Sequence, residues 1–160
     1  MKSVVCLAFA ALFSYATASA ASLTFSQCPA VGNDTSGCEF LITVTSVSGG
    51  AATGFSVAVS SPDQGPYDGS DDTLVGVLNS SGSTLTSLSI SSPLDIFGFD
   101  GDGACSGLSG VIPGCAGFTD PSGYAPAGVT FSGVNASFTS GTVNFTAGLA
   151  DGGSGWFSLE

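Results

Sequence analysis

The chain has 160 residues, with twelve acidic side chains, one basic side chain (Lys2) and no histidine. Beyond residue 20 there is no base at all, so the sequence excludes histidine catalysis, Schiff-base lysines and arginine phosphate clamps, and the remaining net side-chain charge is −12. We therefore expect neither nucleic-acid binding nor docking on an anionic membrane. Hydrophobic residues make up 43% of the chain, which argues against disorder.

The first twenty residues have the layout of a secretory signal peptide. Lys2 precedes an apolar run from Val4 to Phe13, and Ala18-Ser19-Ala20 forms an A-x-A cleavage site. The run is shorter than the roughly 20 residues that span a bilayer. We expect cleavage after residue 20, a single secreted domain over residues 21–160, and no membrane association after cleavage. The alternative interpretation of the segment is a buried N-terminal helix.

Four cysteines follow the predicted cleavage site: Cys28, Cys38, Cys105 and Cys115. Four cysteines allow three pairings, and each neighbouring pair here encloses nine residues that include Gly or Pro. This spacing favours two local disulfides, Cys28–Cys38 and Cys105–Cys115, because an exported protein meets an oxidising compartment. A zinc site built from all four is the alternative, but the closely spaced C-x-x-C pairs typical of such sites are missing.

Short apolar runs separated by Gly, Pro, Asp and Ser recur along the rest of the chain. No 3.6-residue periodicity is long enough for a confident helix, whereas short alternating runs with such punctuation are typical of β-strands. We therefore predict an all-β fold, an antiparallel β-sandwich of the jelly-roll kind with eight or nine short strands. The expected strands are Leu23–Phe25, Glu39–Val47, Phe55–Val59, Thr73–Leu78, Leu85–Ile90, Ile96–Phe99, Val129–Val134, Thr142–Thr146 and Trp156–Leu159.

Two aspartate-rich segments are the candidate metal site. The first contains Asp68, Asp71 and Asp72, and the second contains Asp100 and Asp102, with glycines in both. Calcium requires six to eight oxygen ligands, and glycine lets the backbone bring its carbonyls inward. Neither segment fits the EF-hand register, and the same residues also favour plain turns through local hydrogen bonds. The absence of bases strengthens the calcium interpretation, because a buried carboxylate then has only a metal or N–H groups as partners.

Aromatic rings in the loops suggest a second kind of site. Tyr67 and Tyr124 lie in predicted loops and are candidate ligand-binding residues, because exposed rings stack on sugars. Their expected partner is an extracellular polysaccharide. Trp156 lies in the last predicted strand, where a place in the core is the favoured interpretation.

The preferred function is a secreted, non-enzymatic binding or extracellular-matrix protein whose acidic loops are stabilised by calcium. Two alternatives remain open. One is a small glycan hydrolase that uses only carboxylates, with Asp100/Asp102 or Asp68/Asp71 as its acid pair. The other is a structural surface protein that associates with itself. No G-x-S-x-G motif occurs, and there is no histidine to activate a serine.

Several longer motifs carry a resemblance to a known family. These are the segments Gly32–Val44, Gly65–Ser83, Asp95–Gly103 and Ser140–Phe145, together with the closing WFSLE. In these motifs the chain resembles a family of short exported bacterial proteins related to PEP-CTERM sorting-domain proteins. The resemblance implies export but no assigned reaction. The sequence ends at Glu160 without the Pro-Glu-Pro signal, membrane span and basic cluster of the tailed members, so a freely released form is expected.

Overall fold

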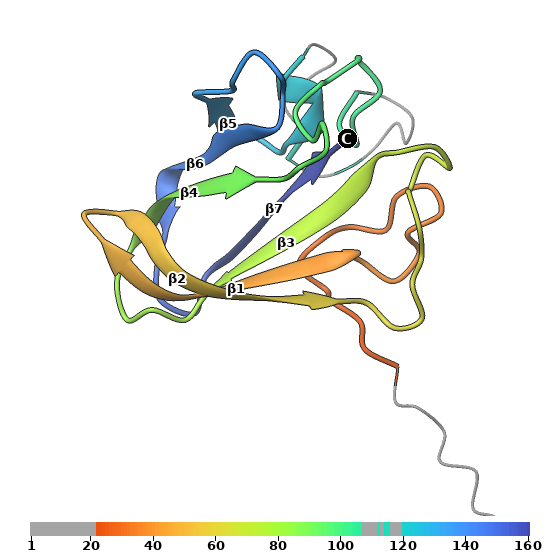
Figure 1. Ribbon diagram of the computed structural model, residues 1–160. Helices are drawn as coiled ribbons and strands as arrows, with labels where there is room; N and C mark the ends of the chain where they lie inside the picture. Colours follow the sequence, from red (N-terminus) through yellow and green to blue (C-terminus); the bar gives the residue numbers. More distant parts are fainter. Residues whose placement is uncertain (1–21, 107–111, 113, 116–119) are drawn as a thin grey trace, which may run out of the picture.

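The computed structural model of the protein describes residues 22–106, 112, 114, 115 and 120–160, and the predicted signal peptide lies outside these residues. The described part is all-β and contains no α-helix, hence no helix that is long and apolar enough to cross a membrane. Its elements (Figure 1) are β1 (Phe40–Ser48), β2 (Ala51–Val59), β3 (Thr73–Asn79), β4 (Leu85–Ser91), the 3₁₀ turn η1 (Ser122–Tyr124), β5 (Val129–Ser132), β6 (Ser140–Leu149) and β7 (Ser154–Leu159).

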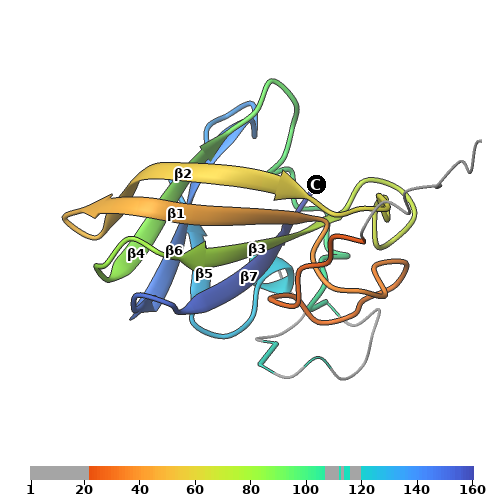
Figure 2. The ribbon, with the colours of Figure 1, turned by 90° about the horizontal axis from the view of Figure 1, so that it is seen from below.

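The seven strands form one mixed sheet in the order β5-β6-β4-β2-β1-β3-β7. Most neighbours are antiparallel, but β1 pairs with β3, and β2 with β4, in parallel. Figure 2 shows β1, β2 and β3 running side by side while β4 and β6 cross them at an angle. The sheet therefore curls back on itself and nearly closes around its apolar side.

This arrangement corrects the predicted set of eight or nine antiparallel strands. Leu23 and Phe25 form only isolated bridges, to Ser61 and Cys38. The segment 96–99 joins no ladder, because the N–H groups of residues 96 and 97 both donate to the carbonyl of Phe138. Within the described residues seven strands remain, and they belong to one sheet instead of two separate ones.

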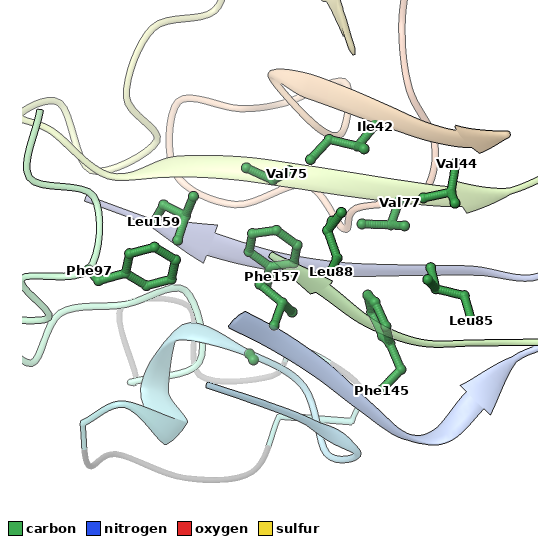
Figure 3. Packing of buried hydrophobic residues seen from close by; sticks show 12 residues of the cluster. Ile42, Val44, Val75, Val77, Leu85, Leu88, Phe97, Phe145, Phe157 and Leu159 are labelled. Carbon is green, nitrogen blue, oxygen red and sulfur yellow. The ribbon is translucent and has the colours of Figure 1, made fainter. Parts of the chain in front are cut away.

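The main core lies between the two halves of the curled sheet. Figure 3 shows side chains from β1, β3 and β7 facing those from β4 and β6 across this space. Phe97, from the loop after β4, is only 2% exposed and packs into the same cluster. The cluster of buried residues comprises Ile42, Val44, Val75, Val77, Leu85, Leu88, Phe97, Ala125, Val143, Phe145, Phe157 and Leu159.

A second apolar cluster covers the outer side of β3 and β7. Leu74 and Trp156 point into it, and they pack there with Phe25, Tyr67 and the cysteines. Because β3 is buried on both faces, its sequence TLVGVLN is a nearly continuous apolar run and does not alternate. Trp156 is 9% exposed, which confirms its predicted place in the core.

Both predicted disulfides are confirmed. Cys28 pairs with Cys38 at a Cα–Cα distance of 4.9 Å, and Cys105 pairs with Cys115 at 5.1 Å. All four cysteines that were candidates for a zinc site are therefore bonded to one another. The first bridge closes the loop that covers β3, and the second lies in the long connection between β4 and β5.

Candidate functional site

The register of β3 and β7 places two acidic residues side by side. The two strands are antiparallel, and Thr73 pairs with Leu159 at the end of their ladder. Asp72 directly precedes Thr73, and Glu160 directly follows Leu159. The next position beyond the ladder therefore has a carboxyl on each strand. Figure 1 shows this end of β7 beside the loop that follows β4.

That loop contributes a third carboxyl, Asp102. Two backbone N–H groups hold the loop against β7 and η1: that of Ala104 donates to the side-chain hydroxyl Oγ of Ser158 (3.4 Å), and that of Cys105 donates to the carbonyl of Gly123 (2.6 Å). As a result Asp72, Asp102 and Glu160 each offer one carboxylate oxygen, and these oxygens all lie within 4.8 Å of one another. We call these three residues the acidic triad.

Asp72 is the inner member of the triad. Its side chain is 0% exposed, whereas Asp102 and Glu160 are half-buried. One oxygen, Oδ2, accepts a 2.6 Å hydrogen bond from the hydroxyl of Tyr67. The other, Oδ1, is buried and has no hydrogen-bond partner among the described residues. Burial, together with the nearby charges of Asp102 and Glu160, raises the pKa of Asp72 to about 8 even though the Tyr67 bond works in the opposite direction.

Tyr124 joins the outer carboxyls into a network. Its hydroxyl lies 3.1 Å from Asp100 Oδ1 and 3.0 Å from Asp102 Oδ1, and it also donates to Glu160 Oε1. Burial raises the pKa of Tyr124, so the phenol stays protonated as a donor. A hydrogen bond between the side chains of Asp100 and Asp102 lowers the pKa of Asp100 and raises that of Asp102.

The five predicted metal ligands separate into two groups in the structure. Asp72 and Asp102 belong to the triad, and Asp100 lies beside it through Tyr124. Asp71 is exposed and is not part of the triad. Asp68 serves its own turn: Asp68 Oδ1 accepts hydrogen bonds from the backbone N–H groups of residues 70, 71 and 72 at 3.0, 3.3 and 3.1 Å. Partial burial acts to raise the pKa of Asp68, but these donors outweigh it and lower the pKa.

The two predicted ligand-binding tyrosines need a correction. Tyr67 is 1% exposed and Tyr124 is 0% exposed, so neither ring presents a face for stacking on a sugar. Tyr67 packs in the second apolar cluster, and Tyr124, the last residue of η1, packs against Phe99. Both rings are thereby enclosed, and both hydroxyls are directed at carboxylates. A polysaccharide partner therefore has no basis in these two side chains.

Glu160 is the site residue that the sequence interpretation missed. The available signal was an acidic residue directly after the strand Trp156–Leu159, matching the acidic residue directly before the strand Thr73–Leu78. That signal has meaning only once the two strands are known to be antiparallel partners. Sequence patterns do not specify the pairing, because residues 80–153 separate these strands in the chain.

The donor set of the triad suits a hard cation. Calcium lies about 2.3–2.6 Å from its oxygen ligands, so two oxygens on one ion can be about 5 Å apart, whereas magnesium brings them to about 4 Å. The triad oxygens, which all lie within 4.8 Å of one another, are close enough to bind one calcium ion together. The chain has no base beyond residue 20, so no side-chain cation of this protein can balance the charge of three clustered carboxylates, and a bound cation could do so. Comparison with protein-family models, curated proteins and solved structures finds no match to this chain.

Proposed function

We propose that this protein is an exported, non-enzymatic binding or surface protein in which one calcium ion at Asp72, Asp102 and Glu160 holds the acidic loops in place. The observation that carries the proposal is the state of Asp72. Its carboxyl is fully enclosed, and its oxygen Oδ1 has no hydrogen-bond partner among the described residues although two other carboxylates lie beside it. A buried polar oxygen without a partner costs about 1–3 kcal/mol, and a cation would recover that energy.

The ion would act as a structural link. Asp72 precedes β3, Asp102 lies in the loop after β4, and Glu160 follows β7, so one bound cation joins three segments that are distant in sequence. Asp100 stands beside these ligands and reaches the same phenol hydroxyl, so it is available to take part in the coordination or to orient Asp102. The remaining calcium ligands would be backbone carbonyls or water.

Two features support the rest of the proposal. The two disulfides fit an exported protein, since bridges of this kind persist in oxidising compartments. The chain beyond residue 20 lacks histidine, lysine and arginine, which supply most general bases and electrostatic clamps in enzymes. Binding without catalysis therefore agrees best with the groups that are present.

Thermal unfolding in calcium and in EDTA tests the proposal. A ligand at about 100 times its Kd contributes about 2.7 kcal/mol, which corresponds to a rise of about 5–10 °C in Tm for a domain of this size. We expect that rise for the wild-type protein in calcium, and a clearly smaller one in magnesium. Asp72→Asn should abolish the rise, because it removes a charged ligand and keeps the shape of the side chain.

Asp71→Asn is the matched control. Asp71 is the exposed neighbour of Asp72, so this variant removes the same charge from the same loop without touching the triad. It should keep the full calcium response. The proposal fails if the wild-type Tm is the same in millimolar calcium and in EDTA, or if the two variants respond alike.

A further inference from the structure

Among the described residues, strand β2 has one edge that is nearly free of partners. On one side β2 pairs with β1 along its whole length, from Ala51 to Val59. On the other side its ladder with β4 consists of the single pair Ala51 and Ser87, next to two N–H donations into the carbonyl of Gly50. Figure 1 shows the two strands diverging from that point. The backbone of residues 52–59 is thus open to another strand along this edge.

The same strand carries a row of exposed apolar side chains. Phe55, Val57 and Val59 are 55%, 54% and 47% exposed, and their spacing places them on one face of β2. Phe55 and Val57 stand opposite Val44 and Ile42 of β1, which are buried in the main core. The row therefore lies on the core side of the sheet, and β4 does not cover it because β4 has turned away.

A groove opens where the two strands diverge. It has a volume of about 220 Å³ and is lined by Ile42, Phe55 and Val57 on one side and by residues 88–91 of β4 on the other. The lining includes Leu88 of the main core. An extended segment with alternating apolar side chains, laid along β2, would cover this groove and satisfy the free backbone groups at the same time.

The distribution of charge indicates which partner fits. No acidic residue occurs in residues 40–62 or 73–94, so strands β1 to β4 and the groove are free of charge on a chain with a net charge of −12 beyond residue 20. Natural edge strands are usually protected by lysine, proline or inward-pointing charges, and β2 has none of these. A second copy of the chain can approach this surface without bringing carboxylates together, whereas its acidic loops would repel one another.

We propose that β2 is a self-association edge: two copies pair their β2 strands antiparallel around a two-fold axis, and the exposed row of each copy covers the groove of the other. In the segment TGFSVAV large apolar side chains alternate with small or polar ones, as such a strand requires. In a two-fold arrangement this segment of one copy pairs with the same segment of the other copy. This interface is remote from the triad in sequence and does not depend on calcium binding.

Analytical ultracentrifugation of the wild-type protein over about 5–500 µM tests the proposal, because dimers held by a modest interface dissociate in this range. We expect a concentration-dependent dimer in calcium and in EDTA alike, which separates this inference from the calcium proposal. Val57→Asp adds a charge to the row and should give only monomer. The matched control, Thr130→Asp, adds the same charge to an exposed position of β5 and should still dimerise.

Hydrogen exchange of the wild-type protein is a second measurement of the interface. Because it uses no variant, a folding defect cannot account for its result. Amide exchange within residues 52–59 should slow as the protein concentration rises, while exchange in β5 should stay constant. A wild-type protein that remains monomeric throughout overturns the proposal. A dimer that persists in Val57→Asp also overturns the proposal, and so does a dimer whose formation leaves amide exchange in β2 unchanged. In both cases the two copies would associate through another surface or another strand edge.

Discussion

Asp34 is a second carboxyl that the fold keeps away from water. Its side chain is 0% exposed, and neither carboxyl oxygen has a hydrogen-bond partner among the described residues. The residue lies inside the loop closed by the Cys28–Cys38 disulfide, where Val31 and Asp34 exchange backbone hydrogen bonds. Burial, and then the charges of Glu39 and Asp63, raises the pKa of Asp34 to about 7. Folding therefore favours the protonated form of this carboxyl.

This shift predicts a pH dependence of stability. Because the folded-state pKa of about 7 lies above the ordinary value of 3.8, the folded protein holds a proton that the unfolded chain releases between these values. The contribution of Asp34 to the free energy of unfolding is fully present at a pH below its ordinary pKa. It is lost as the pH rises to about 7, with a slope of at most about 1.4 kcal/mol per pH unit. Urea unfolding in EDTA across this window measures it.

The variant for this test is Asp34→Asn, which keeps the shape of the side chain and cannot titrate. As the pH increases from about 4 to about 7, the wild-type protein loses the stability that Asp34 contributes, and the variant does not. The free energy of unfolding of Asp34→Asn should therefore rise relative to the wild-type value by that amount. Asp95→Asn, at an exposed position, should follow the wild-type curve. Parallel curves for the wild-type protein and Asp34→Asn would contradict the assignment.

Sequence patterns identified part of the site at the residue scale. Asp72 and Asp102 were predicted as ligands because they lie in glycine-rich acidic loops, and the structure brings these two together. Asp68 has the same local sequence character, yet its carboxylate is used by three backbone N–H groups of its own turn. Which aspartate closes a turn and which one faces another loop depends on backbone conformation, which composition does not specify.

At the scale of elements, β3 is the strand on which both apolar clusters depend. Leu74 points into the second cluster, whereas Val75 and Val77 point into the main core. Between them Gly76 lies against the Cys28–Cys38 disulfide: a Cβ atom at this position would be 2.5 Å from Cys38 Sγ. The glycine is needed here for close approach of the covering loop to the strand.

Replacing this glycine should destabilise the protein. Gly76→Ala forces the disulfide loop or the strand to move, and overpacking of this kind costs about 1–3 kcal/mol. Gly54→Ala in β2 is the control, because the added methyl group there meets the hydroxyls of two exposed side chains, which can rotate away. Urea unfolding should show a lower midpoint for Gly76→Ala and little change for Gly54→Ala. Equal midpoints would show that the loop does not press on β3.

The predicted elements agree with the structure where local patterns decide them. The apolar runs Glu39–Val47 and Thr73–Leu78 become β1 and β3, and equal cysteine spacing correctly indicated both disulfides. Strand order was not predictable in the same way. The parallel pairs β1–β3 and β2–β4 need long connections, and local sequence patterns do not specify which distant strands pair.

At the scale of the whole molecule, charge and apolar surface are separated. The strands of the sheet carry no charged side chain, and the acidic residues lie in the loops and at strand ends. With no base beyond residue 20, the fold handles its carboxylates in three ways: backbone N–H groups at Asp68, protonation at Asp34, and a close cluster at the triad. The third is the arrangement for which a cation is the natural partner.

Isothermal titration of calcium into the EDTA-treated and dialysed protein distinguishes a calcium site from an acidic cluster that binds no ion. We expect saturable binding of one calcium ion per chain, lost in Asp72→Asn and retained in Asp71→Asn. Absence of any calcium binding to the wild-type protein, or binding that Asp72→Asn leaves intact, would contradict the calcium proposal.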